Sequence, residues 1–136
     1  MLEKIFGKNI GKKKGKKVLI VEDDSLLAKV LAESFLKEKF QVAVVDNGLV
    51  AEKTAKSFSP DIILLDLIIP GLDGFAVLKQ LKAGAKTKNI PVAVLSNLGD
   101  AGDIKSTKAL GADEYFIKAN TEMEKIVKYV KNKLKV

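Results

Sequence analysis

Short, uninterrupted apolar runs alternate with longer amphipathic stretches from residue 18 to the end of the chain. The first run, residues 18–21, reads VLIV and ends in acids, which is typical of a strand buried on both faces. From Ser25 onward, apolar residues, Val30 among them, recur every three or four positions, as in a helix with one buried side. Because this alternation continues along the chain, we predict an α/β fold in which helices cover both faces of a parallel sheet.

The same patterns predict four more strands and four more helices. The strands are expected at residues 42–45, 61–66, 91–96 and 114–117, and the helices at 48–58, 75–81, 100–110 and from Thr121 onward. Gly111 is expected to close the helix at 100–110 in a left-handed conformation. Thr121 followed by Glu124 has the spacing of a capping box at the start of the last helix. Five strands alternating with five helices predict a doubly wound fold.

Composition excludes several kinds of chemistry. The chain has no cysteine and no histidine, which excludes disulfides, thiolate metal sites, Ser-His-Asp and Cys-His catalysis and His-ligated zinc. No apolar run is long enough to span a bilayer, and the first residues are too polar for a secretory signal. We therefore expect a cytoplasmic protein.

The positive charge is concentrated at one end of the chain. Of the formal net charge of +7, residues 1–17 hold seven lysines against one acid, whereas the remaining 119 residues hold 17 lysines and 16 acids. We therefore divide the chain into a basic tail, residues 1–16, expected to be flexible, and a folded domain, residues 17–136. A nearly neutral domain argues against direct DNA binding by the folded part.

Polar side chains follow the expected strands at their carboxyl ends, where parallel sheets form their sites. They are Glu22, Asp23 and Asp24 after the first strand, Asp66 after the third, Ser96 at the end of the fourth and Lys118 after the fifth. Clustered carboxylates repel one another unless a cation lies between them, and Mg²⁺ prefers such oxygen ligands. One carboxylate could then attack a phosphoryl group whose oxygens the hydroxyl and the ammonium would bind. The pattern predicts a phosphoryl-transfer site.

Four motifs in this chain are those of a known family: VLIVEDDS, DIILLDLIIPGLDG, AVLSN and GADEYFIKAN. From Lys17 to the C-terminus the sequence resembles response-regulator receiver domains. The resemblance implies a flavodoxin-like (βα)5 fold whose five parallel strands lie in the order 2-1-3-4-5. It also implies a phosphorylation-activated switch of two-component (phosphorelay) signal transduction.

The resemblance assigns a role to each polar strand end. Asp66 is the expected phosphoacceptor, forming an aspartyl phosphate. Glu22, Asp23, Asp66 and the backbone carbonyl of Ile68 are the expected Mg²⁺ ligands. Ser96 and Lys118 would bind the phosphoryl group, and Tyr115 would move inward on activation.

The sequence departs from the family pattern around the phosphoryl group. Ala119 follows Lys118 where the family has a proline with a cis bond, so we expect a trans bond or a strained loop. Two positions that flank the phosphoryl group in receivers hold the apolar residues Ile68 and Leu98. Neither side chain can position a hydrolytic water, and both can shield the acyl phosphate. We therefore predict slow self-dephosphorylation.

The expected partners follow from the resemblance. A histidine kinase or phosphotransfer protein would phosphorylate the domain. The last helix reaches the end of the sequence, so we expect no output domain after it and a switch that acts by docking. The docking face would be formed by the fourth helix, fifth strand and fifth helix, around Lys105, Lys108 and Tyr115. We expect a switch that promotes its own phosphorylation, not an enzyme.

Two alternatives stay open for the domain, and several for the tail. The domain could be a degenerate receiver that acts as a phosphorylation-independent scaffold. It could also be a phosphatase-like enzyme, although such hydrolases generally need an acid at the position of Ile68. The tail could be a flexible solubilising arm, or could contact an anionic membrane, a nucleic acid or a partner protein. Residues 2–10, if helical, would gather apolar side chains on one side for membrane contact.

Overall fold

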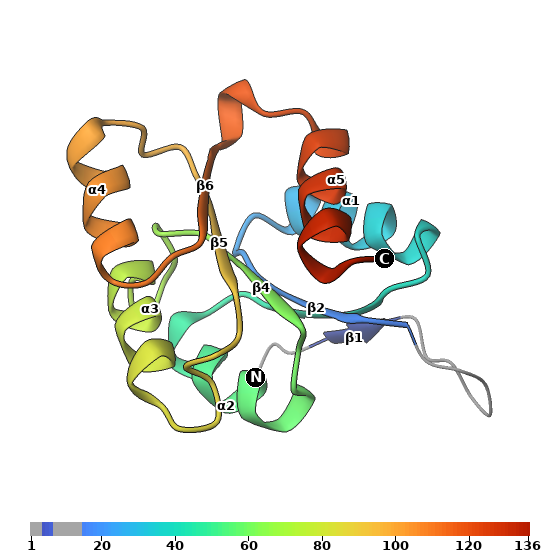
Figure 1. Cartoon of the computed structure of the whole chain (residues 1–136), viewed down its shortest axis with the longest axis horizontal. Coiled ribbons are helices and arrows are strands. Elements are labelled where there is room, and N and C mark those ends of the chain that lie inside the picture. The colour runs from blue at the N-terminus through green and yellow to red at the C-terminus, as the bar shows by residue number, and fades with distance from the viewer. Residues whose placement is uncertain (1–3, 7–14) are drawn as a thin grey trace.

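The computed structural model describes residues 4–6 and 15–136. Five parallel strands form the body of a central sheet (Figure 1). In chain order they are β2 (Lys17–Val21), β3 (Gln41–Val45), β4 (Ile62–Leu65), β5 (Val92–Ser96) and β6 (Glu114–Ile117). Side by side they lie in the order β3-β2-β4-β5-β6, which is 2-1-3-4-5 when the parallel strands alone are counted. The predicted fold class and strand order are confirmed.

Five α-helices connect and cover these strands (Figure 1). They are α1 (Ser25–Lys37), α2 (Ala51–Phe58), α3 (Gly74–Ala83), α4 (Ala101–Ala109) and α5 (Met123–Leu134), with two short 3-10 helices, η1 (Gly48–Val50) and η2 (Lys118–Asn120). Helices α1 and α5 pack on one face of the sheet, and α2 and α3 pack on the other. Among the described residues, no helix combines the length and apolarity needed to cross a bilayer.

The two covered faces explain why the strands read as continuous apolar runs. In β2, Val18 and Ile20 belong to the core beneath α1 and α5, whereas Leu19 and Val21 belong to the core beneath α2 and α3. All four side chains are almost fully buried. A strand covered on one face only would alternate apolar and polar residues. The uninterrupted run therefore reports helices on both sides.

A sixth strand, β1 (Lys4–Phe6), lies at one edge of the sheet (Figure 1). It pairs antiparallel with β3, opposite residues 42–44. The sequence pattern does not predict this strand, and the strand conformation of residues 4–6 differs from the helix considered for residues 2–10. The rest of that range, and the other tail residues up to 14, lie outside the described residues.

One of the two predicted helix caps is confirmed, and the other prediction is wrong. Gly111 has a φ of +105° after α4, and the N–H of Ala112 donates to the Thr107 carbonyl, as in a Schellman cap. The predicted capping box at Thr121 is absent, because α5 has Glu122 as its N-cap and no side-chain cap bond. The Thr121 hydroxyl instead donates to the Ile117 carbonyl at 2.8 Å. This bond spans η2, and α5 begins only after it, at Met123.

Candidate functional site

Three carboxylates meet at the carboxyl ends of β2 and β4. Glu22 follows β2 directly and Asp66 follows β4 directly, and only 3% and 5% of their surfaces are exposed. Asp23 is exposed beside them, and each of the three residues offers an oxygen within 4.8 Å of the others. Adjacent parallel strands in register (Val21 beside Leu65) bring these residues together, as the sequence predicts.

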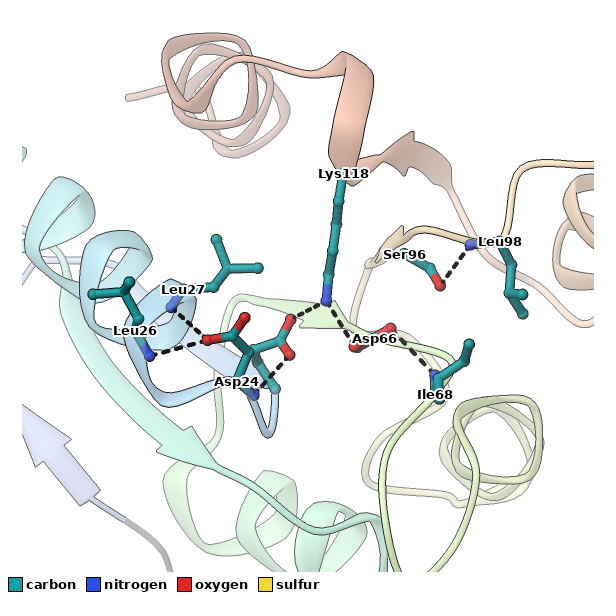
Figure 2. A network of polar contacts seen from close by, with 9 residues as sticks. Asp24, Leu26, Leu27, Asp66, Ile68, Ser96, Leu98 and Lys118 are labelled. Carbon is teal, nitrogen blue, oxygen red and sulfur yellow. Dashed lines mark hydrogen bonds and ion pairs between the residues drawn. The ribbon is translucent and has the colours of Figure 1, made fainter.

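Lys118 supplies the counter-charge from the other side of the site. Its side chain extends from the segment after β6 to Asp66 (Figure 2). The Nζ atom lies 2.8 Å from Asp66 Oδ2 and 2.7 Å from Glu22 Oε1, so one ammonium bridges both buried carboxylates. The bond from Lys118 to Ala119 is trans, since the described residues contain no cis peptide.

The cluster shifts the pKa of two of its members. Burial raises the pKa of Glu22, and the hydrogen bonds from Lys118 and the Asp24 N–H offset this only in part. Burial lowers the pKa of Lys118, but its bonds to Asp66 and Glu22 outweigh this and leave the pKa above its ordinary value. Lys118 therefore remains a cation at neutral pH.

Backbone contacts fix the orientation of the two buried acids. The Asp24 N–H donates to Glu22 Oε2 at 3.0 Å, and the Ile68 N–H donates to Asp66 Oδ1 at 3.2 Å. Gly74, the first residue of α3, lies so close that an added Cβ would be 2.4 Å from the Asp66 carbonyl oxygen. A side chain at that position would displace the loop that carries Asp66.

Ser96 and Tyr115 connect the site to the neighbouring strands. Ser96, the last residue of β5, is fully buried, and its Oγ accepts from the Leu98 N–H at 3.3 Å (Figure 2). The Tyr115 hydroxyl donates to the Leu98 carbonyl. Burial, and then the charge of Asp103, raise the pKa of Tyr115. The loop after Ser96 is thus tied to β6 through Tyr115.

The two apolar flanking residues lie on the loops that leave the site (Figure 2). Ile68 is 59% exposed and Leu98 is half-buried. Two further exposed apolar residues, which the sequence pattern does not predict, lie on the outer side of α1. Leu26 is 71% exposed, and Val30, which the apolar spacing assigns to the buried side of the helix, is 41% exposed. The available signal was the position of Leu26 in the first turn of the helix, two residues after the N-cap Asp24.

The donor set fits Mg²⁺. It consists of hard carboxylate oxygens, two of them on buried side chains that the backbone already orients. One lysine leaves the three acids with an excess of negative charge, which a divalent cation would neutralise. Glu22, Asp23 and Asp66 are therefore the residues that could hold the ion.

A doubly wound parallel sheet with clustered acids, a serine and a lysine at its carboxyl edge defines a receiver domain. The model of the response regulator receiver domain family matches residues 18–131. The chain belongs to this family, whose domains act as phosphoacceptor switches in two-component signalling.

The relatives include proteins of different length. Sporulation initiation phosphotransferase F of Bacillus subtilis is 38% identical over 102 residues, covering 75% of this chain and 81% of that protein. The DNA-binding response regulator MtrA of Mycobacterium tuberculosis is 33% identical over the same share of this chain, which spans 43% of MtrA. The chain therefore spans less than half the length of these DNA-binding relatives.

Solved receiver structures share the fold. The BeF3-activated N-terminal receiver domain of Klebsiella pneumoniae RstA superimposes with a TM-score of 0.79 at 26% sequence identity. The match covers 85% of this chain and 96% of that domain.

Proposed function

We propose that this chain is a phosphorylation-activated switch in which Asp66 accepts a phosphoryl group from a histidine kinase or phosphotransfer protein in a Mg²⁺-dependent reaction. The observation that carries the proposal is the buried Asp66 carboxylate, held 2.8 Å from Lys118 Nζ beside two further acids. Membership of the receiver family supports it. The division into a tail, residues 1–16, and a receiver domain, residues 17–136, and a cytoplasmic location belong to the same proposal.

Each side chain at the site has a task in this reaction. A carboxylate oxygen of Asp66 attacks the phosphorus, and the bond from phosphorus to the donor nitrogen breaks. Mg²⁺, held by Glu22, Asp23, Asp66 and the Ile68 carbonyl, would neutralise charge on the phosphoryl oxygens. Lys118 offers an ammonium to one of these oxygens, as it now does to Asp66. The Ser96 hydroxyl oxygen accepts a hydrogen bond from the Leu98 N–H, and its O–H group can therefore donate to a second phosphoryl oxygen.

The signal would leave the site through the loop after β5. A phosphoryl group that accepts a hydrogen bond from the Ser96 hydroxyl would shift Ser96 and, through the bond from the Leu98 N–H, the loop at Leu98. The Leu98 carbonyl accepts from the Tyr115 hydroxyl, so this shift would reach Tyr115. Tyr115 lies on β6, in the face formed by α4, β6 and α5. We propose that an unidentified downstream protein reads this face, around Lys105, Lys108 and Tyr115.

The alternatives receive less support. A phosphatase-like enzyme would need an acid two residues after Asp66, where Ile68 stands. A scaffold that acts without phosphorylation would not require a lysine that bridges two buried acids, Glu22 and Asp66. We therefore propose a switch that promotes its own phosphorylation and slow dephosphorylation and releases no product other than phosphate.

Incubation of the purified chain with acetyl phosphate tests the proposal. Intact mass spectrometry should show one added phosphoryl group in the presence of Mg²⁺ and none when EDTA removes the ion. A chain that gains no phosphoryl group from acetyl phosphate at any Mg²⁺ concentration would favour the scaffold.

The acyl phosphate should persist for much longer than seconds, because Ile68 and Leu98 offer no group that positions a water. Replacing Ile68 by glutamate should shorten its lifetime by at least about tenfold, since a positioned general base contributes ~10²–10⁴ in rate. Decay after removal of acetyl phosphate, followed by intact mass, measures this. Leu49→Glu, at a leucine of similar exposure on η1, is the control. A wild-type lifetime of only seconds would refute the shielding role.

The exposed apolar side chains of α1 should contact the phosphodonor protein. Leu26 and Val30 lie one helical turn apart, and the Leu26 N–H bonds to Asp24 beside the acidic cluster. Leu26→Ser should slow phosphotransfer from a phosphorylated protein donor by about tenfold, because burying a leucine is worth ~1.5–3 kcal/mol. Phosphorylation by acetyl phosphate should not change.

The matched control for this surface is Val136→Ser, at an exposed apolar residue that follows the C-terminal end of α5. It should leave both reactions unchanged. If Leu26→Ser slows acetyl phosphate and protein donors equally, the residue acts on the site and not on docking.

A further inference from the structure

Five lysines and two acids, Glu38 and Glu124, line two adjoining hollows at the end of α1 and along α5. The larger hollow measures about 540 Å³ and the smaller about 150 Å³, and both are lined by Glu38 and Val136. The two helices lie side by side with the C-terminus close to them (Figure 1). We call this surface the basic pole; its lysines are Lys16, Lys37, Lys39, Lys128 and Lys131.

Lys16, Lys37 and Lys39 of the basic pole lie at the end of the sheet opposite the phosphoacceptor site, and the larger hollow extends from there along α5 to Met123. Asp66 follows the carboxyl end of β4, whereas Lys16 directly precedes the amino end of β2 and Lys39 lies just before β3. Helices α1 and α5 run back from the site, so that their last turns reach the amino ends of the strands. A ligand at the basic pole would therefore leave the phosphoacceptor site accessible to its own partners.

The pole carries an excess of unneutralised positive charge. The ion pair between Lys131 and Glu38, with 2.6 Å between Nζ and Oε1, neutralises one lysine. Lys37, Lys39 and Lys128 are exposed, and none has an acidic partner within 4.0 Å among residues 15–136. A lysine in the last turn of a helix, such as Lys37, stabilises the helix dipole. Lys39 and Lys128 do not lie in the last turn of a helix, so the helix dipole does not account for them.

Two lysines at or next to the basic pole have a left-handed backbone conformation, which is a second indication that the positive charge there has a function. Lys39, between α1 and β3, has a φ of 71°, and Lys135, after α5, has a φ of 59°. Glycine adopts this left-handed region without the steric cost that a side chain brings. Lysine at both positions adds charge next to the basic pole despite that cost.

We propose that the basic pole binds anionic phospholipid surfaces and holds the receiver domain against a membrane with Asp66 directed away from it. Lysines near an anionic leaflet each contribute to binding, and clusters of four to eight basic residues are typical of segments that bind anionic lipids. The apolar Val136 is 56% exposed between the two hollows, and can contact the interfacial region. This inference goes beyond the switch function and does not depend on phosphorylation.

The chemistry of the pole favours a membrane over a nucleic acid. The chain contains no arginine, the residue that pairs bidentately with guanine and with phosphate. Phe40, the aromatic residue that lines the smaller hollow, is 3% exposed and offers no face for base stacking. Point charges with an adjacent apolar residue suit a layer of headgroups.

Co-sedimentation of the full unphosphorylated chain with vesicles tests the proposal. Phosphatidylcholine vesicles containing phosphatidylglycerol should bind the chain at low salt, and vesicles of phosphatidylcholine alone should not. The double variant Lys37→Gln, Lys128→Gln should bind at least about tenfold more weakly. The matched variant Lys53→Gln, Lys79→Gln changes two exposed helical lysines on α2 and α3 and should bind as the wild type does.

Three outcomes would overturn the proposal. Failure of the wild-type chain to bind vesicles that contain phosphatidylglycerol would exclude an anionic membrane as the ligand. Equal binding of the wild type and the Lys37, Lys128 variant would assign binding to lysines outside the basic pole. Binding to an oligonucleotide but not to vesicles, with the same loss in the variant, would make the partner a nucleic acid. With EDTA and without a phosphodonor, none of these results depends on Asp66 phosphorylation.

Discussion

Replacing Asp66 by asparagine should abolish phosphorylation by acetyl phosphate, with an expected loss of at least ~100-fold in rate. An amide oxygen is a poor nucleophile, and the substitution also removes one charge from the proposed Mg²⁺ site. Asparagine keeps the volume of the side chain, and its oxygen can still accept the Ile68 N–H. Intact mass after incubation with acetyl phosphate and Mg²⁺ measures the effect, and thermal melting checks the fold.

Asp73→Asn is the matched control for this substitution. Asp73 caps α3 on the loop that follows Asp66, and asparagine caps helices equally well. This variant should be phosphorylated at the wild-type rate. Phosphorylation of Asp66→Asn at the rate of Asp73→Asn would show that another residue accepts the phosphoryl group.

Replacing Lys118 by methionine should destabilise the Mg²⁺-free protein by about 2 kcal/mol. The expected loss lies below the ~3–5 kcal/mol of a fully buried pair because 16% of the Lys118 side chain is exposed. The free energy of unfolding from denaturant titration, with and without Mg²⁺, measures it. Mg²⁺ should stabilise the variant more than the wild type, since the ion would replace the missing ammonium beside Glu22 and Asp66.

The destabilisation by Lys118→Met should also depend on pH. Loss of the Lys118 bond raises the pKa of Glu22 further above its ordinary value. A raised carboxyl pKa stabilises the folded state below the unfolded pKa, and that stability is lost as the pH rises through the folded pKa. The difference between variant and wild type should therefore shrink when the pH falls from neutral toward the ordinary pKa of glutamate.

The control is Lys131→Met, which breaks an equally short ion pair with Glu38. Both partners of that pair are more than a third exposed, so that the expected effect is below ~1 kcal/mol. Equal, small effects of the two substitutions, with no additional stabilisation by Mg²⁺, would contradict the bridging role of Lys118.

The sequence predicts the fold because strands β2, β3, β4 and β5 are buried on both faces. The VLIV run at residues 18–21 has core on either side, and a loop and then a helix follow each such run. Strand β1 could not be predicted, since three residues at a sheet edge carry no periodicity and depend on pairing with β3. The exposure of Val30 was missed because the spacing of apolar residues cannot distinguish a core position from an exposed apolar surface.

The composition of the site is predictable, whereas its contacts are not. Glu22, Asp66 and Lys118 stand at strand ends in the sequence, and parallel strands bring such ends together. That one ammonium bridges both acids, and that Tyr115 bonds to the carbonyl of Leu98, depends on loop conformations and rotamers. The missing capping bond at Thr121 has the same origin, because η2 redirects its hydroxyl to Ile117.

Chemical trapping of the acyl phosphate tests the central claim most directly. Borohydride reduces an aspartyl phosphate to homoserine, and peptide mapping then locates the modified position. We expect homoserine at position 66 alone, and only in protein treated with acetyl phosphate and Mg²⁺. Homoserine at position 23 or 24, or a stable phosphoryl adduct that borohydride does not reduce, would contradict Asp66 as the phosphoacceptor.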